Sequence, residues 1–176
     1  MMKNVFLLLF IVSLSFNYYQ HRQNNNFKLS IGSEYLNTVR NTVFDLDGPS
    51  TFWIEELKKD KGDVLLERHI GELQANAINF NKIGGKYQII GVQLQHISNL
   101  YWDLSTAVKN KDNDKIIDLN SQIEEHKNFI IKVLKQVDKN LGDNQILWYR
   151  ELSNPNSKTS NLFWNELKAF ESNNKN

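Results

Sequence analysis

The sequence predicts a mainly α-helical fold, a helical bundle with a long antiparallel helical hairpin behind an N-terminal hydrophobic segment. Three observations support this. Apolar residues alternate at spacings of three and four through the centre of the chain, a short polar break divides that pattern into two comparable arms, and an apolar block precedes it. The alternating spacing places side chains on one stripe of a helix, which must be buried against other helices.

The hairpin is predicted from residues 83–108 and 116–137, rods of roughly 39 and 33 Å at 1.5 Å per residue. The apolar stripe comprises Ile83, Tyr87, Ile90, Leu94, Ile97, Tyr101, Leu104 and Val108 on the first arm, and Ile116, Leu119, Ile123, His126, Ile130, Val133 and Val137 on the second. The break at 109–113 is short, so the arms should be antiparallel neighbours, with Asp112 able to cap the second. Because a buried imidazole needs a hydrogen-bond partner, we expect Tyr87, Gln95 or Tyr101 to supply one to His126.

Small residues recur every seven positions beside the first arm, at Ala77, Gly84, Gly91, Ser98 and Ser105. Small side chains let a neighbouring helix approach closely. Glycine inside a helix costs about 1 kcal/mol relative to alanine, and the apolar stripe shifts phase by one residue between Phe80 and Ile83. Gly84-Gly85 also suits a two-residue β-hairpin turn, so an α+β fold with a small hairpin stays open as the alternative.

Further helices are expected on both sides of the hairpin. Residues 31–46 carry apolar residues at helical spacing and end at the turn signal Asp47-Gly48-Pro49-Ser50. A short helix should follow from residue 51, capped by Ser50 or Thr51, and another after Asp63 as its cap. The last third predicts helices over residues 144–152 and 160–170.

Residues 1–19 are predicted to be a signal peptide or a membrane anchor. Lys3 precedes the apolar run Val5 to Phe16, and a charged start followed by about 7–15 apolar residues is the layout of a signal peptide. Tyr18 and Tyr19 suit a membrane interface and favour retention, with membrane contact through residues 5–19. Both alternatives predict an extracytoplasmic location. Residues 20–30 are predicted to be a polar linker, 31–171 the helical bundle domain and 172–176 a polar tail.

Composition removes several function classes. The chain has 21 Lys+Arg against 20 Asp+Glu and no cysteine. Near-neutral charge argues against nucleic-acid binding, and the absence of cysteine excludes disulfides and thiolate metal sites. No nucleophile, phosphate-binding or metal-ligand motif occurs. We therefore expect a protein that is not an enzyme and uses no cofactor.

Aromatic doublets supply the candidate contact residues. Trp53, Trp102, Trp148 and Trp164 each adjoin another aromatic residue, and only one of two adjacent helix residues can face the core fully. These tryptophans, with Gly84, Gly91 and His126, are the candidate partner or ligand contacts.

These features predict an exported or membrane-tethered, non-catalytic bundle that acts through a protein partner or self-association, in a structural, adaptor or sensor-like role. The alternative is an extracytoplasmic small-molecule or lipid binder with its ligand near Gly84–Gly91 and Trp102. The layout resembles that of extracytoplasmic sensor or adaptor modules in bacteria, with no shared motif.

Overall fold

The computed structural model describes residues 2–173, which form seven α-helices and a short 3-10 helix without any strand. The elements are α1 (Met2–Leu46), α2 (Thr51–Glu56), α3 (Gly62–Ile83), η1 (Gly85–Tyr87), α4 (Gln88–Asn110), α5 (Asn113–Leu141), α6 (Gln145–Leu152) and α7 (Lys158–Asn173). The predicted mainly α-helical bundle is confirmed, and the α+β alternative is wrong for this part of the chain. Met1 and residues 174–176 of the expected polar tail lie outside the described residues.

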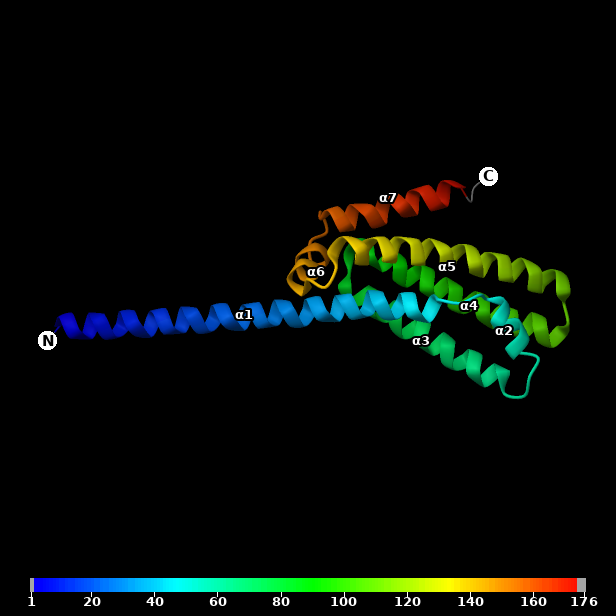
Figure 1. Ribbon diagram of the computed structural model, residues 1–176, viewed down its shortest axis with the longest axis horizontal. Coiled ribbons are helices and arrows are strands. Elements are labelled where there is room, and N and C mark those ends of the chain that lie inside the picture. The colour runs from blue at the N-terminus through cyan, green and yellow to red at the C-terminus, as the bar shows by residue number, and fades with distance from the viewer. Residues whose placement is uncertain (1, 174–176) are drawn as a thin grey trace.

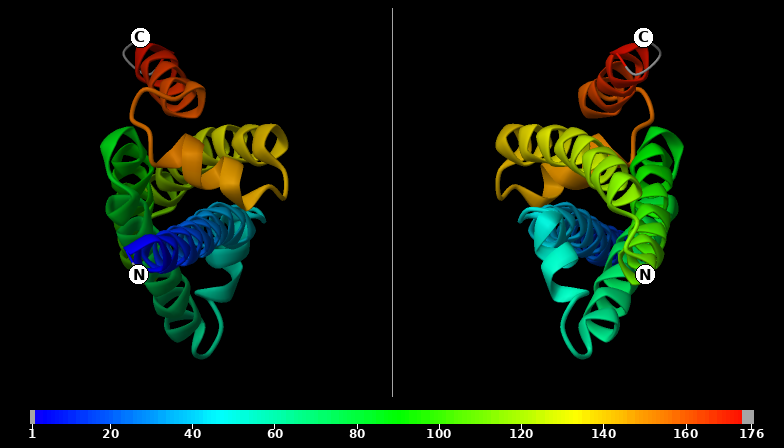
Figure 2. Two further views of the ribbon diagram at one scale, coloured as in Figure 1. Left: turned by 90° about the vertical axis from the view of Figure 1, so that its left-hand side faces the viewer. Right: turned by 90° about the vertical axis from the view of Figure 1, so that its right-hand side faces the viewer.

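Four helices enclose the core: the second half of α1 together with α3, α4 and α5 (Figures 1 and 2). Each packs against the next, and α5 closes the ring against α1. α6 packs against α1 at one end, and α7 lies outside the ring against α5, α6 and η1. The core side chains with no exposed area include Val39, Leu73, Phe80, Ile90, Leu94, Ile97, Leu104, Ile123, Ile130, Val133, Leu134, Val137 and Trp148.

The long hairpin is formed by α4 and α5, which pack side by side and are joined by Lys111 and Asp112. Lys111 adopts the left-handed conformation (φ 57°, ψ 34°) that ends α4. The Asp112 carboxylate accepts a hydrogen bond from the Lys115 backbone N at 3.2 Å and so caps α5, as expected. The predicted antiparallel hairpin is therefore confirmed, with a later start to its first arm.

That later start is caused by Gly84 and Gly85. α3 ends at Ile83, and both glycines have positive φ (80° and 57°) in the corner that leads through η1 into α4. Glycine adopts this backbone conformation without steric cost, so these two residues do not incur the helix penalty expected from the sequence. The phase shift between Phe80 and Ile83 marks where α3 stops, and α3 and α4 form a second hairpin with the most extensive packing in the fold.

The small residues let α3 and α4 approach closely, as predicted. A Cβ atom at Gly91 would lie 2.8 Å from the Ala77 carbonyl oxygen and 2.6 Å from Asn81 Oδ1. Ser98 and Ser105 are buried further along the same helix. Gly91 therefore lies where the α4 backbone closely approaches α3 at Ala77.

The start or the cap differs from the expected one in three further helices, although α2 begins at Thr51 as predicted. Lys61, in the left-handed conformation, precedes α3, so Asp63 lies in the first turn and is not the cap. A Cβ at Gly62 would lie 1.8 Å from the Glu56 carbonyl oxygen, so only glycine fits where the start of α3 approaches the end of α2. Ser50 precedes α2, but its hydroxyl makes no capping bond. α7 begins earlier than predicted, at Lys158, with Ser157 Oγ accepting from the Ser160 backbone N at 2.9 Å.

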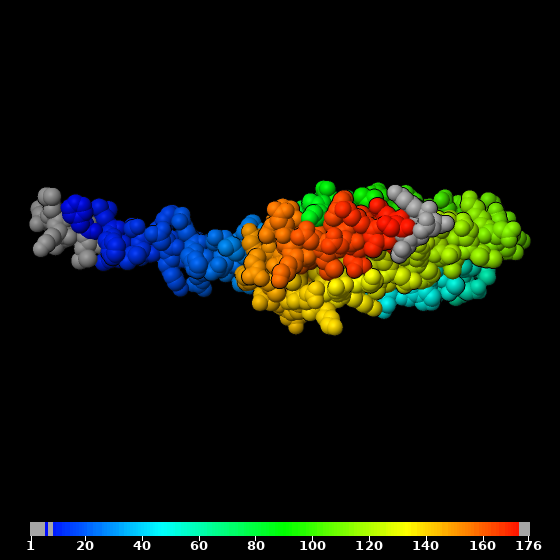
Figure 3. Space-filling model, turned by 90° about the horizontal axis from the view of Figure 1, so that it is seen from above, coloured from blue at the N-terminus to red at the C-terminus, as the bar shows by residue number. Residues whose placement is uncertain are grey.

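α1 is continuous through residues 20–30, the segment expected to be a linker. Side chains one turn apart are hydrogen-bonded to each other along α1; for example, Gln23 Nε2 donates to the Tyr19 hydroxyl at 2.8 Å. The helix is roughly 67 Å long at 1.5 Å per residue, and its first half extends away from the bundle (Figure 3). Among the described residues, no helix combines the length and the apolar content that a bilayer crossing demands.

Replacing Gly32 by alanine is expected to destabilise the fold. Gly32 is buried where α1 crosses the start of α6, and a Cβ there would lie 1.8 Å from the Gln145 carbonyl oxygen. Overpacking costs about 1–3 kcal/mol, which outweighs the gain of about 1 kcal/mol that alanine brings to a helix. Urea denaturation measures the change.

Gly71→Ala is the matched control, because Gly71 lies inside α3 with nothing within 4 Å of the added Cβ. This variant should gain up to about 1 kcal/mol of stability. If Gly32→Ala were stabilising as well, the close crossing of α1 and α6 would be wrong.

Candidate functional site

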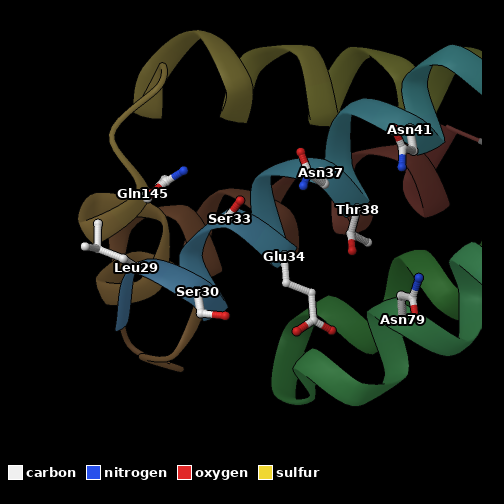
Figure 4. Close-up of a pocket in the computed structure, with 9 residues that line it drawn as sticks. All are labelled: Leu29, Ser30, Ser33, Glu34, Asn37, Thr38, Asn41, Asn79 and Gln145. Atoms are coloured by element: carbon white, nitrogen blue, oxygen red, sulfur yellow. The ribbon is translucent and has the colours of Figure 1, made fainter. Parts of the chain in front are cut away.

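A polar groove of about 600 Å³ lies between α1, α3 and the start of α6. It is lined by Leu29, Ser30, Ser33, Glu34, Asn37, Thr38, Asn41, Asn79 and Gln145. Figure 4 shows Glu34 extending from α1 toward α3, which carries Asn79. The lining combines the Glu34 carboxylate with hydroxyl and amide side chains. The groove can therefore hydrogen-bond a polar partner.

A second hollow, the apolar groove, lies between α4 and α7 and has a volume of about 470 Å³. Its apolar lining comprises Ile89, Val92, Pro155, Trp164 and Leu167, with Gly85, Lys86, Gln88, Gln93 and Glu171 completing it. It brings Trp164 to the segment between the predicted Gly84 and Gly91. Gly91 itself is buried against α3 and does not line the groove.

The third hollow, which we call the corner pocket, has a volume of about 300 Å³ and lies where α1 ends and α2 begins. It is lined by Asp45, Leu46, Asp47, Gly48, Pro49, Phe52, Trp53, His69, Tyr101 and Lys127. His69 stacks on Trp53 at a ring distance of 4.7 Å and meets the edge of Tyr101 at 5.3 Å. His69 and Lys127 are buried, with 8% and 3% of their area exposed.

A polar network from α5 holds the loop that borders this pocket. Lys127 Nζ donates to the Gly48 carbonyl oxygen and, at 3.1 Å, to Glu124 Oε1. The same Glu124 oxygen accepts from the Ser50 backbone N, and Ser50 Oγ donates to Asn120 Oδ1 at 2.7 Å. Buried charges are retained when they are paired and hydrogen-bonded, so α5 fixes the α1–α2 loop over the corner pocket.

The surroundings of the pocket shift several pKa values. Burial lowers the pKa of His69 to about 4, with the Glu72 carboxylate opposing this and the Lys127 ammonium adding to it. Burial also raises the pKa of Asp45, despite the hydrogen bond from Asn76. For Glu124, burial acts upward, but the hydrogen bonds from Ser50 and Lys127 outweigh it and the net pKa is lowered. His69 is therefore neutral near pH 7.

The sequence predicted that His126 lies on the buried stripe of the second arm, and this prediction is wrong. Its neighbour Lys127 takes that place, and His126 is half-buried at the edge of the core. Its Nδ1 lies 2.7 Å from Gln93 Oε1, so the expected partners Tyr87, Gln95 and Tyr101 are wrong. His126 and Lys127 follow Ile123 by three and four residues, so both fit the helical spacing of the stripe. The aliphatic part of the Lys127 side chain lies in the core, and its amine reaches the loop.

His126 instead belongs to a small aromatic cluster of α4, α5 and α7. Its ring lies 4.6 Å from that of His96 and 5.2 Å from that of Phe170. Burial lowers the pKa of His126, the nearby His96 adds to this, and Glu125 opposes it. Across the described residues, no group of three or more histidine, aspartate or glutamate side chains is arranged to hold a metal ion.

The four tryptophans are dispersed and form no common patch. Trp148 is fully buried and donates through Nε1 to the Gly142 carbonyl oxygen at 2.7 Å. Trp53 lines the corner pocket, and Trp164 lines the apolar groove. Trp102 and Trp164 are 42% and 40% exposed. Gly84 belongs to the corner between α3 and α4.

Sequence reasoning missed His69, Lys127 and the loop-holding residues of α5. Asn120, Glu124 and Lys127 are spaced by four and three, so they share one helix face. That spacing could have indicated a shared polar contact, but charged residues on one face of a helix are usually exposed to solvent. Comparisons with protein-family models, with curated proteins and with solved structures find no match to this chain.

Proposed function

We propose that this protein is an exported or membrane-tethered, non-catalytic helical bundle that acts through protein contacts. The observation that supports this best is the outer part of α1, which extends beyond the bundle (Figures 1 and 3) and leaves its large apolar side chains exposed. These side chains are Phe6, Leu9, Phe10, Ile11, Val12, Leu14, Phe16, Tyr18 and Tyr19.

The exposed side chains surround the helix. Residues 9–12 are consecutive, each rotated by about 100° from the one before, so together they cover every side of it. A helix that lies on a membrane surface needs one polar face, and this segment has none. An apolar run of about 7–15 residues after a charged start matches the segment that export machinery takes up.

The location is tested with charged substitutions in the apolar run. In a bacterial host, the wild-type chain should be recovered outside the cytoplasm, shortened at its N-terminus if cleaved or in the membrane fraction if retained. The double variant Phe10→Asp, Leu14→Asp should stay in the cytoplasm. Fractionation and N-terminal mass spectrometry provide the readout.

Phe27→Asp is the matched control, because Phe27 is equally exposed on α1 but lies beyond the apolar run. It should be exported as the wild type is. Intact wild-type protein found wholly in the cytoplasm would contradict the proposed location.

Protein contacts are proposed for the bundle surface, where Trp102 is 42% exposed on α4. Exposed tryptophans are frequent anchors of protein interfaces. A photo-crosslinking amino acid at position 102 in intact cells should form an adduct with a partner or a second copy. Lys139, exposed on α5, is the control position. Absence of any adduct from position 102 counts against this half of the proposal.

The apolar groove supports a second candidate, extracytoplasmic binding of a small apolar molecule or lipid. Trp164 lines the groove and reports on its occupancy. A fatty acid should shift the tryptophan fluorescence of the wild type, and Trp164→Phe should abolish the shift. Trp102→Phe should preserve it, because Trp102 does not line the groove. An unchanged spectrum across apolar ligands would remove this candidate.

A further inference from the structure

The corner pocket contains a buried hydrogen-bonding group that the fold does not use. His69 is 8% exposed and lines the cavity. None of the side-chain hydrogen bonds of the described residues involves the His69 ring, whose contacts are the stacking on Trp53 and the edge of Tyr101. Because buried polar groups in folded proteins are nearly always paired with protein or with water, a ring without a protein partner beside a cavity is available to a ligand that enters the cavity.

The charges that line the pocket favour a cation. Lys127 is engaged by Glu124 and by the Gly48 carbonyl oxygen. Asp45 is partly buried and accepts a 2.6 Å hydrogen bond from Asn76, a neutral group. Among the ion pairs of the described residues, none involves Asp45 or Asp47. Two carboxylates thus line the cavity without a counter-ion, while its lysine is already neutralised.

The aromatic wall supports an organic cation. Trp53 lies 5.0 Å from Phe52 and 6.3 Å from Tyr101 between ring centres, and all three line the cavity. Aromatic faces attract ammonium groups through the ring quadrupole. A metal ion would require several ligating side chains, and no such cluster exists among the described residues.

We propose that the corner pocket binds a small organic ammonium ion, which donates to the Asp45 carboxylate and the His69 ring and places its apolar part against Trp53 and Tyr101. A neutral imidazole can accept such a bond without repelling the cation. The volume of about 300 Å³ holds about ten non-hydrogen atoms if each takes the ~30 Å³ share of a liquid water molecule. The binding does not depend on the proposed export or protein contacts.

Three probes of matched size test the charge preference by isothermal titration calorimetry and tryptophan fluorescence on the full chain. They are 2-phenylethylammonium, the neutral 2-phenylethanol and the anionic phenylacetate. The ammonium compound should bind saturably, at least about tenfold more tightly than the other two, and such a ratio corresponds to about 1.4 kcal/mol. Tighter binding of phenylacetate would overturn the proposal by pointing to Lys127 as the recognising group.

Asp45→Asn tests the carboxylate, since asparagine has the same shape and can still accept from Asn76. This variant should bind the ammonium probe at least about tenfold more weakly. Glu34→Gln is the control, because Glu34 lines the polar groove and not the corner pocket. Equal binding by Asp45→Asn and the wild type, or no saturable binding by the wild type at millimolar probe, would overturn the proposal.

If Asp45→Asn fails to fold by circular dichroism, the wild type still decides the question. The ammonium probe should shift the His69 imidazole proton resonances more than those of His21, which lies on the exposed part of α1. Unchanged His69 resonances at saturation would show that the probe binds elsewhere.

Discussion

Replacing Trp148 by alanine is expected to lower the free energy of unfolding by about 3–5 kcal/mol. Trp148 is the largest fully buried side chain, and its indole N–H bonds the Gly142 carbonyl oxygen at 2.7 Å. The substitution removes apolar contacts and leaves a cavity between α6 and its neighbours. It also leaves the Gly142 carbonyl oxygen without its hydrogen bond from the indole. Urea denaturation, monitored by circular dichroism because the fluorophore is removed, measures the loss.

Trp164→Ala is the control for this prediction. Trp164 is 40% exposed at the edge of the apolar groove, so its removal should cost much less than that of Trp148. Equal losses in the two variants would contradict the burial that distinguishes these tryptophans.

Stability is expected to fall by about 3 kcal/mol on acidification because of His69, as a pKa difference of one unit equals about 1.36 kcal/mol. Its pKa is about 4 in the folded protein and 6.5 ordinarily. Below pH 6.5 the unfolded chain binds a proton that the folded protein excludes. The contribution of His69 is therefore fully present above pH 6.5 and is lost progressively as the pH falls toward 4.

His69→Phe isolates this effect, because phenylalanine can keep the stacking on Trp53 but cannot titrate. The comparison also cancels the acid dependence of other groups, including His126, whose pKa is lowered too. Urea denaturation across this pH range should show a flatter dependence for the variant. Identical slopes for the variant and the wild type would mean that His69 is solvated or already partnered.

Much of the fold follows from local patterns. The hairpin of α4 and α5, the cap at Asp112, the turn after Leu46 and the helix around Trp148 were all predictable, because spacing, capping and turn residues act within a few positions of the chain. The Gly84 corner was ambiguous for the same reason. Positive φ at glycine serves a helix corner and a β-hairpin equally, and only packing between α3 and α4 decides between them.

The candidate site was much less predictable. His126 and Lys127 both satisfy the spacing from Ile123, and a scale of hydrophobicity prefers histidine for the buried place. Lys127 is buried because its amine meets the Gly48 carbonyl oxygen and Glu124, and that loop lies 79 residues away in the chain. No local pattern reports a partner so distant.

The sequence by itself determined that the chain forms long amphipathic helices with an apolar segment before them, because helical periodicity and side-chain chemistry are properties of neighbouring residues. Only the tertiary structure decided which tryptophan is buried, how closely α1 crosses α6 at Gly32, and that Asp45, His69 and Lys127 share one cavity. Those outcomes depend on backbones approaching across the fold, where a few ångströms separate a contact from open solvent.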